Sequence, residues 1–165
     1  MKILVLSDSH SAMRFMRSCV EAIKPQAIVH LGDHYDDAET LKELYPHIEL
    51  HQVPGNCDRY RCPPWVHARL CYDVCGVRLF MTHGHKYGVK TSTAMMLAEA
   101  RAMKAQAALY GHTHVAECYR EETGMWVLNP GSSGYGGGSA GLLEVEDKAI
   151  VSCRVITADD LEEFV

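Results

Sequence analysis

The chain opens with the stretch KILVLSDSH at residues 2–10. Its apolar part gives way at once to polar residues that include Asp8 and His10, and a short apolar run with polar bounds is typical of a buried strand. Residues 12–23 follow with apolar side chains at helical spacing, and Pro25 ends that helix. This strand–helix unit predicts an α/β fold with Asp8 and His10 at the carboxyl end of the first strand.

The same alternation continues outward from this unit. We expect a second strand at 26–31, a helix over 36–45 that Pro46 stops, and a third strand at 48–53. Strands that are separated by crossover helices run parallel. The first third of the chain therefore predicts a parallel sheet.

The later part of the chain favours hairpins. The pattern predicts a helix over 90–105 and strands at 66–73, 77–82, 108–110, 115–120, 125–128, 140–146 and 149–156. The last four strands are expected to be antiparallel, and the glycine-rich stretch 129–141 is the least regular part. These elements predict an α/β sandwich of mixed sheets that forms one domain over residues 1–165.

Composition limits the class of protein. The 165 residues are 47% hydrophobic and 22% charged, which is typical of a globular domain and excludes wholesale disorder. The formal net charge is −5, from 16 Lys and Arg against 21 Asp and Glu. Without a basic excess the chain is not expected to bind long nucleic acids.

The expected compartment is the cytoplasm. The apolar run at 2–6 is shorter than that of a secretory signal peptide, and no run approaches the roughly 20 residues that span a bilayer. Seven cysteines are scattered, and the closest spacing is that of Cys71 and Cys75, so no zinc cluster is expected. We expect reduced thiols, mostly in the core.

Polar residues follow five of the predicted strands directly. In open α/β sheets, ligands bind beyond the carboxyl ends of the strands, so these residues are expected to share one edge. The candidate metal ligands are Asp8, His10, Asp33, Asn56, His83, His112 and His114. This set of oxygen and nitrogen donors lacks thiolates, which points to manganese, iron, zinc, nickel or magnesium.

Seven ligands are too many for one tetrahedral ion. They suit two divalent ions about 4 Å apart that share a carboxylate. Two such ions exceed the charge of the two aspartates by two units, which attracts a phosphate and stabilises charge that develops on it. A water between the ions would lose its proton near neutral pH.

These residues form ordered motifs. The motifs are D-x-H at 8–10, G-D-x-x-D at 32–36, G-N at 55–56, T-H-G-H at 82–85 and G-H-x-H at 111–114. In this the chain resembles the calcineurin-like metallophosphoesterase superfamily over residues 2 to about 155. The sequence Asn-Pro-Gly-Ser at 129–132 also resembles the compact bacterial and archaeal phosphodiesterase branch.

The resemblance implies an αββα sandwich with a dinuclear centre, in which Asp33 bridges two ions. It implies that Asp8, His10 and His114 complete the first site and that Asn56, His83 and His112 complete the second. The implied reaction is hydrolysis of a small or medium phosphodiester by in-line attack of a metal-bridging hydroxide. Manganese is preferred, with nickel, zinc, iron or magnesium as alternatives, and the resemblance suggests a homodimer or homotetramer.

One position departs from the family pattern. Many relatives carry a histidine after the G-N motif that helps to protonate the leaving oxygen, and this chain carries Cys57. A thiol is a poor proton donor near pH 7, so substrates with good leaving groups are favoured. We assign catalytic roles to Asp33, Asn56 and His85, and substrate contacts to Asn56, Cys57 and His85. His85 is the nearest replacement donor, although a supporting or surface position is the favoured interpretation of this residue.

Other residues receive simpler interpretations. Asp36 either orients a ligand or begins a helix, Asp58 is expected in a turn, and His51 is expected at the surface. An alternative function is a protein-interaction scaffold, because the retromer small subunit resembles this fold with an altered metal site. A nuclease is a third alternative, and only short oligonucleotides fit the net charge.

Overall fold

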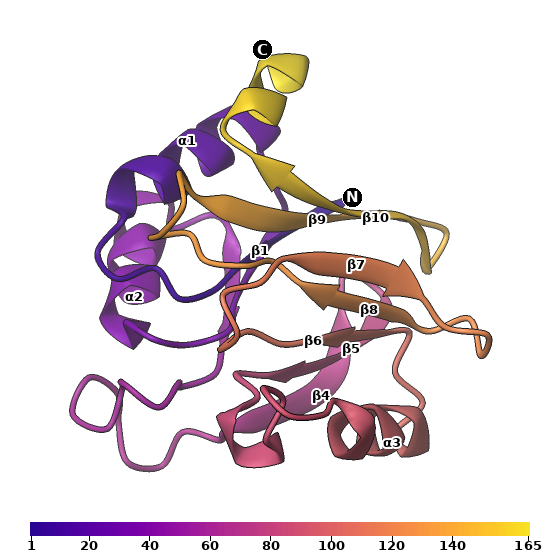
Figure 1. The fold of residues 1–165 in the computed structure, drawn as a ribbon. Helices are drawn as coiled ribbons and strands as arrows, with labels where there is room; N and C mark the ends of the chain where they lie inside the picture. The colour runs from indigo at the N-terminus through magenta and orange to yellow at the C-terminus, as the bar shows by residue number, and fades with distance from the viewer.

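The computed structural model describes residues 1–165 and arranges them in four layers (Figure 1). Two five-stranded sheets pack face to face, two helices cover the outer face of one sheet, and a third helix covers the outer face of the other. Both sheets contain parallel and antiparallel pairs. The predicted αββα sandwich of two mixed sheets is therefore confirmed.

Sheet A contains the three strands that the opening third of the sequence predicts. β1 (Lys2–Leu6), β2 (Ala27–His30) and β3 (Glu49–Gln52) run parallel. β9 (Ser139–Glu146) and β10 (Ala149–Thr157) add to β1 as antiparallel strands, in the order β10-β9-β1-β2-β3. The carboxyl ends of β1, β2 and β3 therefore meet at one edge.

Sheet B has the order β4-β5-β6-β8-β7. β4 (Arg69–Val74) and β5 (Val77–Thr82) form the expected hairpin, and β6 (Ala107–Leu109) lies parallel to β5. β7 (Glu117–Arg120) is antiparallel to β8 (Trp126–Asn129), but β8 is parallel to β6. The expectation of only antiparallel pairing here was incomplete, because β7 takes the outer edge and β8 returns beside β6.

The helices complete the outer layers. α1 (Met13–Ile23) and α2 (Tyr35–Leu44) cover sheet A, and α3 (Ala94–Ala102) covers sheet B. Two short 3-10 helices, η1 (His85–Tyr87) and η2 (Asp159–Phe164), follow β5 and β10. None of these helices combines the length and the apolar character that crossing a bilayer requires.

Apolar side chains fill all three interfaces between layers. Fifteen buried residues, Val5 and Leu109 among them, form the core between the two sheets. α1 buries Met16, Val20 and Ile23 against sheet A, as the three-and-four spacing of an amphipathic helix requires. The two sheets are thereby held at a fixed distance, with their strand ends along a common edge.

The third helix is shorter than expected. The sequence predicts a helix over 90–105, whereas α3 begins four residues later, where the hydroxyl of Ser92 accepts the first backbone N–H of the helix at 3.2 Å. Lys104 ends the helical path with a left-handed backbone at φ 57°. Helical periodicity alone does not show where such a residue turns the chain out of the helix.

Candidate metal centre

Residues from five strand ends converge on one edge of the sandwich. Asp8 and His10 follow β1, Asp33 follows β2, Asn56 follows β3, His83 follows β5, and His112 and His114 follow β6. An unbroken series of side-chain neighbours connects all seven, and the 3.9 Å approach of His83 to Asp8 joins its two parts. Sheet A supplies both carboxylates, the amide and one imidazole, and sheet B supplies three imidazoles. The expected gathering of these residues is present.

The backbone of this edge is unusually bent. Five of the seven candidate ligands have φ values between 43° and 70°, in the left-handed region; they are Asp8, His10, Asp33, His112 and His114. Such a backbone costs a non-glycine residue about 1–2 kcal/mol and concentrates at functional sites. These turns direct the side chains of residues that directly follow strands into the shared edge.

Two glycines allow the loops to approach the carboxylates closely. A Cβ added at Gly55 would lie 2.1 Å from Oδ1 of Asp33, and one added at Gly111 would lie 2.8 Å from Oδ2 of Asp8. Neither distance is tolerated by real atoms, so only glycine fits at these two positions. This explains physically why a glycine precedes the asparagine of G-N and the histidine of G-H-x-H.

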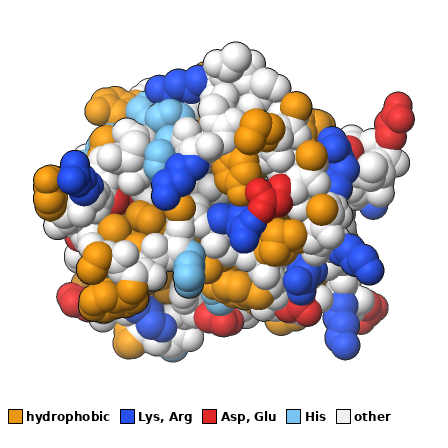
Figure 2. Space-filling model, turned by 90° about the horizontal axis from the view of Figure 1, so that it is seen from below, with side chains coloured by type: hydrophobic (Ala, Val, Ile, Leu, Met, Phe, Trp, Pro, Cys, Tyr) orange, Lys and Arg blue, Asp and Glu red, His pale blue; other side chains and the backbone are white.

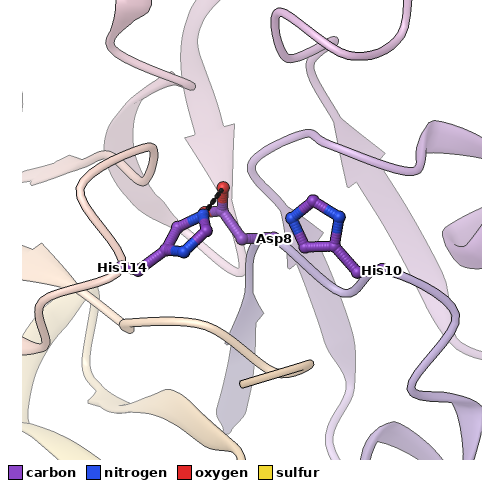
Figure 3. A group of neighbouring side chains, drawn as sticks. All are labelled: Asp8, His10 and His114. Atoms are coloured by element: carbon purple, nitrogen blue, oxygen red, sulfur yellow. Dashed lines mark hydrogen bonds and ion pairs between the residues drawn. The ribbon is translucent and has the colours of Figure 1, made fainter. Parts of the chain in front are cut away.

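One candidate ligand group consists of Asp8, His10 and His114 (Figure 3). Oδ2 of Asp8 accepts bonds from the Ser7 hydroxyl at 2.5 Å and the His112 backbone N–H at 3.1 Å. Oδ1 is left to face Nε2 of His114 at 3.0 Å. Figure 3 shows the carboxylate between the two imidazoles, and Nε2 of His10 is buried without a hydrogen-bond partner.

A second group surrounds the imidazole of His83. Its Nδ1 donates to the backbone carbonyl of Leu31 at 2.8 Å, which leaves the lone pair on Nε2 to face the site. Around Nε2 lie Oδ1 of Asn56 at 3.1 Å, Nδ1 of His112 at 3.2 Å and Oδ1 of Asp33 at 3.6 Å. Each of these atoms can present a lone pair to a cation at their centre.

The charge balance of the site fits divalent ions. The side chains of Asp8 and Asp33 are 0% and 5% exposed, and the ion-pair partners within 4.0 Å are histidines, not lysine or arginine. Buried charges are normally paired or coordinate a metal. The observed donor set, with carboxylate, imidazole and amide atoms, suits the hard and borderline divalent metals that we expect.

The carboxylate of Asp8 lies close to residues of both groups. Donor atoms within 4.8 Å of one another group Asp8 with His10 and His114, and also with Asp33 and His83. Asp8 thus lies beside both Asp33 and His83 of the second group, while the resemblance implies Asp33 as the bridging ligand. The backbone N–H after Asn56 donates to Oδ1 of Asp33 at 2.9 Å and draws that oxygen toward the second group. Bridging by Asp33 stays a prediction.

Burial sets the protonation of the candidate ligands. It lowers the pKa of His10 and of His112, so both imidazoles are neutral near pH 7, as metal binding requires. Burial alone would raise the pKa of Asp33. The backbone hydrogen bond from Cys57 and the charge of His83 outweigh it, so the pKa of Asp33 is lowered. The carboxylate is therefore ionised near neutral pH.

Neither candidate proton donor is well suited to that role. Burial and the charge of Asp33 raise the pKa of the Cys57 thiol, so it holds its proton near pH 7. The ring of His85 lies 5.4 Å from that of His83, and burial lowers its pKa. His85 is therefore mostly neutral at pH 7 and seldom carries the proton that a general acid must donate.

Asp58 has a larger role than the sequence suggested. We expected a turn residue, but its carboxylate is fully buried and accepts the backbone N–H groups of Asp33, Tyr35 and Gly55 at 2.7–2.9 Å. It thereby ties together the loops that follow β2 and β3. The signal in the sequence was an acid two residues after the asparagine of the G-N motif.

The orienting acid near the first loop is Asp37. Asp36, which we considered for this role, lies in the first turn of α2 and forms an ion pair with Arg61 at 2.9 Å. Asp37 accepts the hydroxyl proton of Ser9 at 2.7 Å and the backbone N–H of Ser11 at 2.8 Å. The expectation that Asp36 begins a helix is confirmed, and its expected contact with a ligand is not seen.

Two further residues support the imidazoles. Nδ2 of Asn129, in the 129–132 motif, donates to Oγ1 of Thr113 at 2.9 Å, between the two histidines of G-H-x-H. The ring of Tyr135 stacks on that of His114, with the ring centroids 5.3 Å apart. Sequence reasoning did not identify Tyr135, because it lies in the irregular glycine-rich stretch.

The position of His51 differs from the expected one. We expected this residue at the surface, but it is buried and its Nδ1 forms a hydrogen bond with the Tyr72 hydroxyl.

Comparison with known proteins agrees with this geometry. The family model for the calcineurin-like phosphoesterase superfamily domain matches residues 1–148. The chain is 30% identical over 135 residues to the probable metallophosphoesterase YsnB of Bacillus subtilis. These aligned residues cover 80% of this chain and 75% of that protein.

Solved structures share the fold. An archaeal phosphodiesterase matches with a TM-score of 0.74 and 22% identity, over 95% of this chain and 99% of that one. Vps29 of Entamoeba histolytica, solved with zinc, matches with a TM-score of 0.70 and 20% identity over the same shares. The family model covers most of the chain, and with the shared fold it shows that this protein belongs to the calcineurin-like phosphoesterase superfamily.

Proposed function

We propose that this protein is a metal-dependent phosphodiesterase that hydrolyses a small or medium phosphodiester at a dinuclear centre. The main support is that the buried carboxylates of Asp8 and Asp33 face imidazoles without a lysine or arginine partner. Two divalent ions bound there, manganese first among them, would polarise a phosphoryl oxygen and lower the pKa of an attacking water.

The chain's own residues position the ions and the substrate in this proposal. Asp33 would be a ligand to both ions, and Asp8, Asn56 and the imidazoles would complete the ligand sets. Asn56 directs Oδ1 toward the second group, while Nδ2 lies 3.4 Å from Sγ of Cys57 on the exposed side. That amide group can donate a hydrogen bond to a phosphoryl oxygen and hold the phosphate in line for attack.

The weak acids at the site favour a diester over a simple monoester. The raised pKa of Cys57 keeps its thiol protonated at pH 7, and the lowered pKa of His85 leaves only a small fraction of its imidazole protonated. The leaving oxygen therefore departs with little help, so its own acidity decides the rate. A diester with an acidic leaving alcohol meets this condition better than an alkyl monoester.

A cavity of about 430 Å³ beside Asn56 and His85 provides room for one ester arm. It is also lined by Arg59 and Lys86, whose positive charges suit a phosphate or a further anionic group of the substrate. On the face that includes α3, lysine and arginine side chains are interspersed with apolar and acidic ones (Figure 2). This face therefore presents no continuous basic surface that a long nucleic acid would need, which supports a small phosphodiester or a short oligonucleotide as the substrate.

The test combines metal analysis with a substrate panel. The purified protein is loaded with Mn²⁺, Ni²⁺ or Mg²⁺, its metal content is measured, and hydrolysis of bis(p-nitrophenyl) phosphate is compared with that of p-nitrophenyl phosphate. We expect two ions per chain and faster hydrolysis of the diester. A clear preference for the monoester would contradict the role that we give to Cys57.

A protein-interaction scaffold is the second candidate, supported by the fold shared with Vps29. A scaffold can lose ligands, whereas this chain retains all seven. Full metal occupancy without hydrolysis of any diester would favour the scaffold. A cytoplasmic location and assembly into a homodimer or homotetramer are also proposals; the first is supported by seven free cysteines, and light scattering tests the second.

A further inference from the structure

Two cysteines face each other across one edge of the sandwich, outside the metal centre. Cys118 lies on β7 and Cys153 on β10, which are edge strands of different sheets and lie side by side in Figure 1. Their sulfur atoms are 3.4 Å apart, and Sγ of Cys118 also donates to the backbone carbonyl of Cys153 at 3.2 Å. We call these two residues the thiol pair.

We propose that the thiol pair is a site of oxidative modification, at which a peroxide converts the two thiols into a disulfide that joins the two sheets. A disulfide has a sulfur–sulfur distance of about 2.05 Å, so the sulfurs must approach by only about 1.4 Å. Both residues pack against the edge of the core between the sheets and are partly exposed, which gives a small oxidant access.

The contact between the two sulfurs distinguishes this pair from the other cysteines. The hydrogen bond between the thiols lowers the pKa of Cys118 and raises that of Cys153. Burial instead raises the pKa of each of the other cysteines, which are Cys19, Cys57, Cys62, Cys71 and Cys75. The thiolate is the nucleophile in thiol oxidation, and a thiolate on either sulfur can accept a hydrogen bond from the partner thiol, so the two residues can activate each other.

The reaction balances with one peroxide. The Cys118 thiolate attacks one oxygen of hydrogen peroxide; the S–O bond forms, the O–O bond breaks, and hydroxide leaves, giving a sulfenic acid. The sulfur of Cys153 then attacks that of Cys118; the S–S bond forms, the S–O bond breaks, and the hydroxyl leaves as water with the Cys153 proton. Two thiols lose two electrons in total, and the peroxide is reduced to two waters.

The disulfide would change how the sandwich is held at its edges. At the opposite edge, β3 and β4 are joined by a hydrogen bond between Nδ1 of His51 and the Tyr72 hydroxyl at 2.9 Å. The disulfide would make the β7–β10 edge covalent and would close the loop that contains β8 and β9. Loop closure of this length restricts the unfolded chain, so the expected gain in Tm is about 10 °C.

The experiment treats the fully reduced protein with one equivalent of hydrogen peroxide, quenches with catalase and alkylates the remaining thiols. Mass spectrometry should find a peptide pair linked through Cys118 and Cys153, with five alkylated cysteines. Melting without reductant should show the rise in Tm, and dithiothreitol should reverse it. These measurements need no variant.

Variants separate the thiol pair from general oxidation. Cys118→Ser and Cys153→Ser should remove the rise in Tm, whereas Cys71→Ser, a partly buried strand cysteine outside the pair, should retain it. The proposal is wrong if Cys118 is over-oxidised while Cys153 remains alkylatable, if the link involves other cysteines, or if Cys153→Ser still shows the rise.

Discussion

The two sheets contribute unequal halves to the metal centre. The carboxylates from sheet A are buried, and hydrogen bonds from the same side hold them: the Ser7 hydroxyl bonds to Asp8, and the backbone N–H of Cys57 bonds to Asp33. Among the imidazoles from sheet B, His114 is 37% exposed and bonds to Asp8. Even the buried His83 is oriented by a carbonyl of sheet A, that of Leu31. Sheet A thus pre-organises the site, and bound ions would complete the order on the side of sheet B.

The largest effect should come from a carboxylate on the sheet A side. Asp33→Asn removes the proposed bridge, so both ions should be lost and turnover should fall about 1000-fold, equivalent to the several kcal/mol that bound metal supplies. Metal content and diester hydrolysis measure this. Asp36→Asn, an acid three residues on that pairs with Arg61, is the matched control and should leave both unchanged. Hydrolysis at the wild-type rate by Asp33→Asn would end the dinuclear proposal.

Asp58 and Asn129 hold the loops of the metal centre on the sheet A side and on the sheet B side, respectively, and their replacement should have unequal effects. Asp58→Ala leaves three buried N–H groups unpaired on the sheet A side and should lower the free energy of unfolding by about 4 kcal/mol. Asn129→Ala, on the sheet B side, should lower it by about 2 kcal/mol. Urea unfolding of the metal-free proteins measures both. Equal losses would remove the distinction between the halves.

The third prediction concerns pH and the loop of sheet A. Burial lowers the pKa of His30 from 6.5 to about 4, and its ring bonds to Ser9 and the backbone of Gly32. Between these values the unfolded chain binds the additional proton. Stability from this group is therefore complete above pH 6.5 and falls by about 3 kcal/mol as the pH is lowered to 4.

Urea unfolding at pH 6.5, 5.5 and 4.5 in the absence of metal measures this loss. The lowered pKa values of His10, His85 and His112 act in the same direction, so the difference between the wild type and His30→Gln isolates the contribution of His30. If both proteins lose stability equally with pH, His30 does not carry this dependence.

An imidazole of sheet B should matter less than the bridging carboxylate. His112→Ala should lose one ion and about 100-fold in turnover, at the upper end of the losses caused by changes around bound metals. Added millimolar Mn²⁺ should restore part of the rate, since the carboxylates remain in place. His47→Ala, at an exposed histidine outside both groups, is the control and should retain both ions and the wild-type rate. No recovery with metal would mean that sheet B also pre-organises the site.

The smallest effect should come from the cavity, to which both halves contribute. Arg59 follows β3 of sheet A, and Lys86 lies in η1 after β5 of sheet B. Alanine at either position should raise KM for an anionic diester about 3- to 10-fold with kcat unchanged, because the charge binds substrate and transition state alike. Changes in kcat instead would place that residue at the reacting phosphate.

The strand-end residues could be predicted because their signal is local. Asp8 and His83 each follow an apolar run directly, and parallel strands bring such positions to one edge. Asp58 and Asp37 could not be placed in this way. Apart from Gly55, their partners lie more than twenty residues away, as Ser9 does for Asp37. Asp58 lies in a loop without periodicity, and the helical pattern of α2 does not show which residue Asp37 contacts.

The sequence by itself determined the order of strands and helices, an α/β sandwich of mixed sheets and the candidate ligands, since hydrophobic periodicity and turn residues act over a few neighbours. The αββα class followed from the resemblance of the ordered motifs to a known family. Only the tertiary structure decided that Asp8 contacts both ligand groups, that Asp58 joins two loops, and that Cys118 meets Cys153 across two sheets. Those contacts depend on the distance and angle at which separate sheets pack. The packing is set jointly by the whole core, and no short stretch of sequence encodes it.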